Sequence, residues 1–200
     1  MKGLLILPVI LILLFGTPAF AGPSEGVEAY QSGDYATALR EFKPYAENGQ
    51  FLAQYFLGTM YAKGQGVAQD DKAAIKWYKL SAEQGFAEAQ FNLGVYYYQG
   101  QGVTQDYKIA LKWFKLAAEE GNTIEGTPIA QYQLGMMFAQ GQGVIQDYIF
   151  AHMWWNIAAS LGFKEGAENR DIVGKMMTPS QLEKAQDLAR ECVAKNYKDC

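Results

Sequence analysis

Three near-copies of one segment constrain this chain more than any other feature of its sequence. The copies occupy residues 53–85, 89–121 and 130–162. Gly58 of the first copy recurs as Gly94 and Gly135, and a Gly-Gln-Gly-Val stretch, an aspartate and a tryptophan recur at the same offsets. A regular period of about 20–50 residues is typical of solenoids, whose stacked units share one continuous core. We therefore predict a repeat protein.

Within each copy the pattern predicts two amphipathic helices joined by a reversal. In the middle copy, apolar residues fall at helical spacing over residues 89–97 and again over 110–117. The glycines at 100–103 between them tolerate the positive φ that a reversal needs. Asp106 is placed to cap the second helix. We expect Trp113 and its counterparts to fill the space between neighbouring repeats.

These motifs resemble the Sel-1-like repeat, a relative of the tetratricopeptide repeat (TPR). In all three copies the resemblance rests on Ala-Gln, Leu-Gly, the Gly-x-Gly-Val turn, the aspartate and the tryptophan, and it extends over about 110 of the 200 residues. It implies an all-α fold, a right-handed α/α superhelix that acts as a protein-binding scaffold, often in bacterial envelopes. In the third copy Ile149-Phe150 replace the Lys-Ala of the pattern, which makes that surface apolar.

The N-terminus predicts a secretory signal peptide over residues 1–21. Lys2 is followed by an apolar stretch over residues 4–15 and by Ala19-Phe20-Ala21, a small-x-small cleavage site. The apolar stretch is short for a membrane span, and no cysteine follows Ala21 to carry a lipid anchor. We expect an exported chain, periplasmic or secreted, that begins at Gly22. An uncleaved membrane anchor is the alternative.

We assign the three repeats to residues 51–86, 87–122 and 129–163. The segments around them predict capping helices and a loop. Residues 22–50 have helical periodicity but no Gly-x-Gly-Val stretch or tryptophan, so we expect a TPR-like N-terminal capping pair. Residues 123–128 predict an insertion loop, either harmless or a contact loop, with Pro128 suited to open the next helix. Residues 164–200 predict C-terminal capping helices, the last starting at Thr178-Pro179.

Residue patterns typical of catalysis or metal binding are missing from the sequence. His152, the only histidine, aligns with Ile75 and Leu111 and is interpreted as a packed side chain rather than a ligand or base. No His-Cys cluster has metal-ligand spacing, and the Gly-Gln-Gly triplets lack the Gly-Lys-Ser/Thr of a phosphate loop. The net charge of −4 argues against nucleic acid as the default partner. We expect no cofactor, no metal and a monomer.

Variable positions in the first helix of each copy predict the binding surface. They are spaced by four and then three residues, so each trio lies on one helical face. Stacking would place the trios side by side in a groove on the concave side, where methionine and aromatic anchors suit protein recognition. The alternative, that Met60, Tyr96 and Met137 only pack between repeats, stays open. The nine residues are Phe56, Met60, Lys63, Asn92, Tyr96, Gln99, Gln133, Met137 and Gln140.

These features together predict a non-catalytic exported scaffold that holds a protein or peptide partner. One alternative is a β-lactam-binding or β-lactam-hydrolysing enzyme, as proposed for some secreted relatives in the family that these repeats resemble. Those relatives carry a cysteine pair in each repeat, which this chain lacks. Another alternative is a binder of peptidoglycan or polysaccharide, for which the many tyrosines give weak support.

Cys192 and Cys200, the only cysteines, predict one disulfide in an exported chain. Along an unbroken helix eight residues advance ~12 Å, which exceeds the ~7 Å limit between bridged Cα atoms. The helix must therefore end between them, and we place its end at Asn196 because asparagine tolerates the left-handed conformation. A frayed tail with two free thiols and pairing between molecules are the alternatives.

Overall fold

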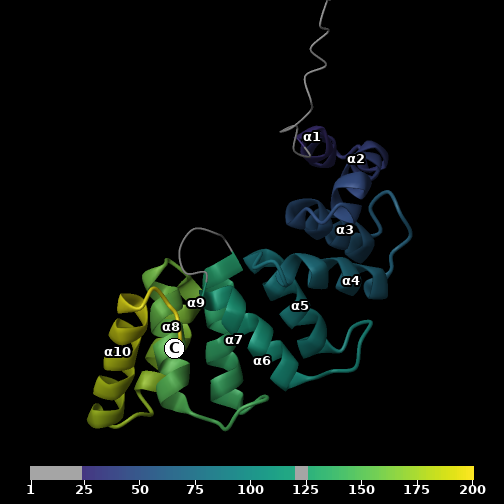
Figure 1. Cartoon of the computed structure of the whole chain (residues 1–200). Coiled ribbons are helices and arrows are strands. Elements are labelled where there is room, and N and C mark those ends of the chain that lie inside the picture. Colours follow the sequence, from purple (N-terminus) through teal and green to yellow (C-terminus); the bar gives the residue numbers. More distant parts are fainter. Residues whose placement is uncertain (1–23, 120–125) are drawn as a thin grey trace, which may run out of the picture.

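The computed structural model describes residues 24–119 and 126–200 and contains ten α-helices and no β-strand in those ranges (Figure 1). None of these helices is long and apolar enough to cross a membrane. The predicted signal peptide, residues 1–21, and residues 123–125 of the predicted insertion loop lie outside the described residues. The helices are α1 Ser24–Ser32, α2 Tyr35–Glu47, α3 Phe51–Lys63, α4 Asp71–Ala82, α5 Ala87–Gln99, α6 Tyr107–Glu119, α7 Gly126–Gln140, α8 Tyr148–Ser160, α9 Lys164–Gly174 and α10 Pro179–Ala194.

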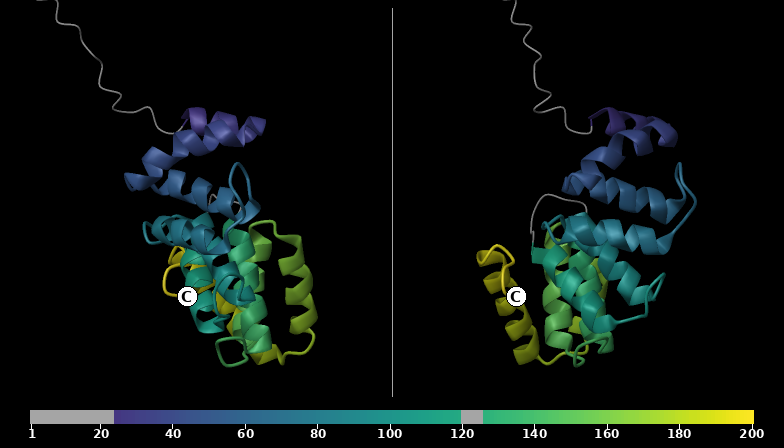
Figure 2. Two further views of the ribbon diagram at one scale, coloured as in Figure 1. Left: turned by 90° about the vertical axis from the view of Figure 1, so that its right-hand side faces the viewer. Right: turned by 45° about the vertical axis from the view of Figure 1, so that its right-hand side comes forward.

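The first eight helices form four successive pairs that stack into one array. Each pair packs within itself, as α3 does with α4, and the second helix of each pair packs on the first helix of the next, as α4 does with α5. Helix α1 lies at one end of the molecule, and α8 lies near the other end together with α9 and α10 (Figures 1 and 2). The predicted all-α superhelix of stacked helix pairs is therefore confirmed.

A glycine in each first helix lets an aromatic ring of the second helix approach the backbone. A Cβ atom at Gly94 would lie 2.7 Å from ring carbons of Phe114, and Gly58 and Gly135 meet Tyr78 and Trp155 in the same way. These contacts are too short for any side chain larger than hydrogen. The recurring Leu-Gly of the sequence is therefore a packing requirement, because it lets the two helices of a pair come close.

The space next to the glycine is filled by Phe114 and not by Trp113, the residue predicted to lie between neighbouring repeats. Phe114 is 1% exposed, whereas Trp113, one position earlier, is only half-buried, and so is its counterpart Trp77. Each of these two tryptophans lies at the edge of a core cluster, with a lysine ammonium 5.5 Å or 5.9 Å from the ring centroid. Only in the third repeat is the tryptophan, Trp154, fully buried. Adjacent residues point about 100° apart on a helix, so only one of the two aromatic side chains can face the glycine.

The loop between the helices of a repeat docks on the preceding pair. Its second glycine has positive φ and lies against the start of the preceding second helix. A Cβ atom at Gly102 would lie 2.5 Å from Cβ of Asp71, and one at Gly66 would lie 2.7 Å from the carbonyl oxygen of Tyr35. The predicted cap Asp106 accepts hydrogen bonds from the backbone N–H groups of residues 108 and 109 at 2.9 and 3.0 Å. The glycine loop therefore both reverses the chain and joins neighbouring pairs.

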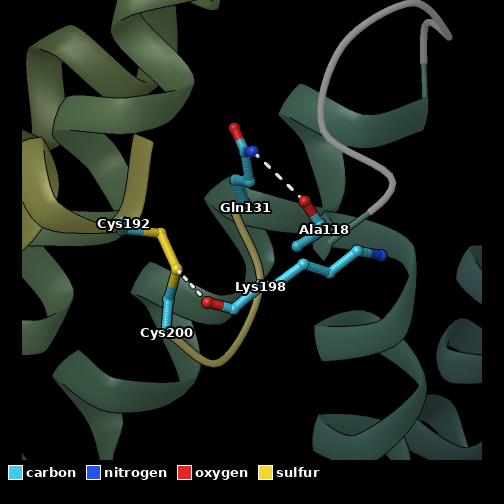
Figure 3. The surroundings of a disulfide bond; sticks show 5 residues. All are labelled: Ala118, Gln131, Cys192, Lys198 and Cys200. Carbon is cyan, nitrogen blue, oxygen red and sulfur yellow. Dashed lines mark hydrogen bonds between the residues drawn. A yellow bond between two sulfur atoms is a disulfide. The ribbon is translucent and has the colours of Figure 1, made fainter. Parts of the chain in front are cut away.

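The glutamine of the recurring Ala-Gln also joins one pair to the next. The side-chain amide of Gln54 donates to the carbonyl of Ala46 at 3.1 Å, and Gln90 donates to Ala82 at 3.2 Å. Gln131 donates to Ala118 at 3.5 Å, across the segment between α6 and α7 (Figure 3). All three glutamines are buried, and each side-chain amide donates to a carbonyl near the end of a helix; the carbonyls of Ala46 and Ala82 also accept the backbone N–H of Gly49 and Gly85.

The first residues of α7 and α10 can be compared with the predicted helix starts. The structure starts α7 at Gly126, so residues 126–128 of the predicted loop are helical and Pro128 lies inside the first turn. The predicted start of α10 is confirmed, because Thr178 and Gln181 form a reciprocal capping box with Pro179 in the first turn.

The predicted disulfide joins Cys192 and Cys200, whose Cα atoms lie 5.4 Å apart (Figure 3). As predicted, α10 ends between the two cysteines, and Asn196 has a φ of 51°. The reversal also places Tyr197 in the core cluster that contains Trp154. The tail is thus held by one covalent bond and one buried ring.

The last two helices depart from the pairing of the repeats. Helix α9 packs on α8, and α10 also packs on α8 rather than forming a pair with α9 (Figures 1 and 2). In keeping with this, Gly166 of α9 lies against Ala158 and the Trp155 carbonyl of α8, not against an aromatic ring of α10. The predicted capping helices are present, but they leave an open space between them.

Candidate functional site

Three of the nine predicted binding residues belong to the interior. Met60 and Met137 are 0% exposed, and Tyr96 is 8% exposed. Met60 packs in the cluster with Phe42, and Met137 packs in the cluster with Phe114, because the middle position of each trio faces the core between helix pairs. These three side chains were predicted to be groove anchors, and their burial contradicts that prediction.

Tyr96 uses its hydroxyl inside the stack. The O–H group donates to Oδ1 of Asp71 in the preceding pair at 3.3 Å. Burial, followed by the charge of that carboxylate, raises the pKa of Tyr96 to about 12. The hydroxyl is thus a protonated donor at neutral pH, and it links two repeats instead of facing a partner.

The other six predicted residues keep accessible surface, and we call them the outer repeat positions. Lys63, Gln99 and Gln140 are exposed and are the last residues of α3, α5 and α7. The remaining three, Phe56, Asn92 and Gln133, are partly buried. The ring of Phe56 stacks on that of Phe42 at a centroid distance of 4.6 Å. The accessible part of the predicted surface is therefore mainly polar.

A second candidate site lies between α8, α9 and α10 and was not predicted. It is a cleft of about 570 Å³, and we call it the C-terminal cleft. A neighbouring cavity of about 400 Å³ shares Asn156 and continues between α8 and α10 along Ile157, Ala189 and Val193. The cleft is lined by His152 and Asn156 of α8, by Arg170, Asp171, Gly174 and Lys175 at α9, and by Leu182 and Gln186 of α10.

Arg170 is held in a fixed position in the cleft by its neighbours. Its Nε donates to Oδ1 of Asp171 at 2.8 Å, and an ion pair of 2.7 Å joins the same two side chains. A terminal nitrogen of Arg170 also donates to Oδ1 of Asn156 at 3.3 Å. Lys175 makes no ion pair within residues 24–119 and 126–200. The lining therefore carries two cations against one carboxylate.

His152 is 4% exposed, and Nδ1 of its ring is buried with no hydrogen-bond partner. Burial lowers the pKa of His152 below its ordinary value, and the nearby Arg170 acts in the same direction. The imidazole is therefore neutral at neutral pH. The opposite edge of the ring faces Gly174, where an added Cβ atom would lie 3.7 Å from both Cδ2 and Nε2.

Only a weak sequence signal points to this cleft. Burial of His152 agrees with its interpretation as a packed side chain. However, His152 and Asn156 replace the Ile75-Lys79 and Leu111-Lys115 of the other copies, so this helix face changes only in the third repeat. The cleft itself depends on where α10 packs, which the repeat pattern does not specify. In the described ranges, no group of three or more His, Cys, Asp or Glu residues could hold a metal ion.

This chain resembles known proteins over most of its length. The Sel1 repeat family model matches residues 52–86, 87–122 and 128–163. A solved structure of a Sel1 repeat protein from Oxalobacter formigenes is 28% identical with a TM-score of 0.72, covering 87% of this chain and 76% of that one. A protective antigen of uropathogenic Escherichia coli with an SLR fold is 29% identical with a TM-score of 0.50 over 86% of this chain. The match spans about half, 47%, of that antigen, and a search of curated proteins found no match.

Proposed function

Because the chain belongs to the Sel1 repeat family, we propose that it is an exported scaffold that holds a protein or peptide partner and catalyses no reaction. Sel1 repeats are typical of protein–protein interaction. One observation carries the proposal: the repeats share their core contacts, whereas equivalent accessible positions differ from repeat to repeat. Lys63, Gln99 and Gln140 occupy the same place in successive pairs and are all exposed. A partner that lies along the stack would meet lysine at the first repeat and glutamine at the next two, and beside them Phe56, Asn92 and Gln133 in turn.

The outer repeat positions supply the contacts in this proposal. Their amides, on Asn92, Gln99, Gln133 and Gln140, can donate to and accept from a peptide backbone. Lys63 adds a positive charge at one end, and Phe56 adds a partly exposed aromatic edge. Polar contacts of this kind favour an exchangeable partner over a permanent one, because permanent interfaces are more apolar.

Export is supported by two features of different kinds. Residues 1–21 have the pattern of a signal peptide, with cleavage expected after Ala21. The disulfide between Cys192 and Cys200 suits an oxidising compartment such as the periplasm or the cell exterior. We propose that the mature protein is a monomer in that compartment.

Affinity capture from an envelope extract tests the scaffold role. The triple variant Lys63→Ala/Gln99→Ala/Gln140→Ala should lose the partner that the unmodified protein retains, with little change in Tm, because all three side chains are exposed. The control variant Lys72→Ala/Lys108→Ala changes exposed lysines at the starts of α4 and α6 and should retain the partner. Equal capture by the triple variant would show that the outer repeat positions are not the binding surface.

A further inference from the structure

The C-terminal cleft exists because α10 does not take the place of a repeat's second helix. Both α9 and α10 pack on α8 (Figure 2). The cleft of about 570 Å³ lies between these three helices and is lined by residues of each. The side chains that reach this floor, His152 and Asn156, are polar, although the equivalent positions carry Ile75 or Leu111 and a lysine elsewhere. The cleft is therefore built from residues that only the third repeat has.

His152 is a polar group that the packing of the protein does not explain. Burying an imidazole without a hydrogen bond is unfavourable, and leucine fills the same position in the second repeat. Nδ1 has no partner, so the tautomer that carries the proton on Nε2 avoids an unpaired buried N–H group. Nε2 lies on the ring edge that faces Gly174 in the cleft. The ring therefore offers the cleft a hydrogen-bond donor.

Around this donor the cleft gathers further N–H groups and a net positive charge. Three of the five N–H groups of Arg170 are used by Asp171 and Asn156, which leaves two for a ligand. Lys175 adds an ammonium without an ion pair in the described ranges, and Gln186 adds an amide from α10. A planar carboxylate is the anion that the arginine fork fits best.

We propose that the C-terminal cleft binds the free C-terminal carboxylate of a short peptide. The carboxylate accepts hydrogen bonds from Nε2–H of His152, from Arg170 and from Lys175. The amides of Asn156 and Gln186, on facing helices, pair with the peptide backbone. The preceding peptide residues occupy the mainly apolar cavity that continues from Asn156 between α8 and α10. This site is separate from the outer repeat positions and does not rest on the function proposed above.

Nuclear magnetic resonance titration of the whole protein tests the proposal with a stated probe. The probe is acetyl-Ala-Ala-Leu as the free acid, and the comparison is the same peptide with an amidated C-terminus. The free acid should shift the backbone amide signals of Gly174, Lys175 and Gln186 and bind about tenfold more tightly than the amide, the loss expected for one charge-assisted contact. Equal affinity of the two peptides, or shifts confined to other residues, would overturn the proposal. Equal shifts with sodium acetate would overturn the peptide part of it.

Two variants separate binding from folding. Lys175→Gln removes an exposed charge with no ion pair in the described ranges and should weaken binding about tenfold at unchanged Tm. His152→Leu should abolish binding while raising Tm, because leucine replaces an imidazole with an unpaired buried nitrogen.

Lys164→Gln, at an exposed lysine at the start of α9, is the matched control and should bind normally. The triple variant at the outer repeat positions should also bind the probe normally. Normal binding by His152→Leu and Lys175→Gln would contradict the proposed site.

Discussion

In the repeats, each second helix packs against the first helix of its own pair, whereas α10 packs against α8 and leaves α9 on the other side of a cleft. The repeats are held by contacts that recur: a glycine under an aromatic ring, a glutamine on a helix-end carbonyl, and a loop glycine on the preceding pair. The C-terminal helices have stabilising features that occur only once, namely the capping box and the disulfide. The packing of α10 on α8 therefore departs from the pattern that the repeats share.

The N-terminal pair shows that the glycine rule extends beyond the matched repeats. A Cβ atom at Gly26 of α1 would lie 2.7 Å from the ring of Phe42 in α2, as in the three repeats. The loop of the first repeat also docks on this pair, at the carbonyl of Tyr35. The N-terminal pair is therefore built as a shortened repeat, whereas the C-terminal end is not.

The largest predicted effect comes from removing the aromatic ring that meets the glycine. Phe114→Ala should lower the free energy of unfolding by about 3–5 kcal/mol, because it empties a fully buried space. Trp113→Ala should cost roughly half as much, since that ring is only half-buried. Urea denaturation of both variants measures the difference. A larger loss for Trp113→Ala would show that the tryptophan contributes more to stability than the ring that meets the glycine.

Removing the disulfide should destabilise the C-terminal helices and leave the repeats unchanged. Cys192→Ser/Cys200→Ser should lower the free energy of unfolding by roughly 2–3 kcal/mol in the chain-entropy model. Hydrogen exchange should speed up in the last turns of α10 and stay unchanged in α3 to α6. A thiol titration of the unmodified protein under denaturing, non-reducing conditions should find no reactive thiol. Two thiols per chain would show that the bond does not form.

A matched pair of glycine variants isolates the docking of one repeat on the next. Gly102 and Gly85 both have positive φ, but only Gly102 touches the preceding pair, because nothing lies within 4 Å of an added Cβ at Gly85. Both alanine variants should lose about 1–2 kcal/mol from backbone strain. Gly102→Ala should lose about 1–2 kcal/mol more, because it pushes against Asp71. Equal losses in thermal unfolding would show that the loop glycine serves the reversal alone.

The smallest predicted effect is a pH dependence located in the cleft. The pKa of His152 is lowered from 6.5 in the folded state, so the unfolded chain binds the proton more readily. The stability associated with neutral His152 is present above pH 6.5 and is lost as the pH falls below that value. His152→Leu should remove this part of the pH dependence, and Tm measured across that range checks it. An unchanged pH profile in the variant would assign the effect to other groups.

The sequence predicted the parts of this fold that depend on local signals. The helix pairs, the caps at Asp106 and Thr178 and the reversal at Asn196 follow from spacing, side-chain hydrogen bonding and chain geometry. Burial of Met60 and Met137 did not follow, because α3 and α7 are apolar on most faces and spacing alone does not show which side chain meets a neighbour. The C-terminal cleft was not predicted because it depends on whether α10 packs on α8 or on α9, which the repeat pattern does not specify.

The central claim is that the outer repeat positions hold the partner, while the C-terminal cleft is a separate site. Partner affinity, measured by isothermal titration with the captured protein, tests it in three forms of the chain: unmodified, Lys63→Ala/Gln99→Ala/Gln140→Ala, and Lys175→Gln. We expect a loss of about tenfold or more for the triple variant, as for the loss of several interface contacts. We expect no change for Lys175→Gln. Unchanged affinity in the triple variant, or a loss confined to Lys175→Gln, would contradict the account.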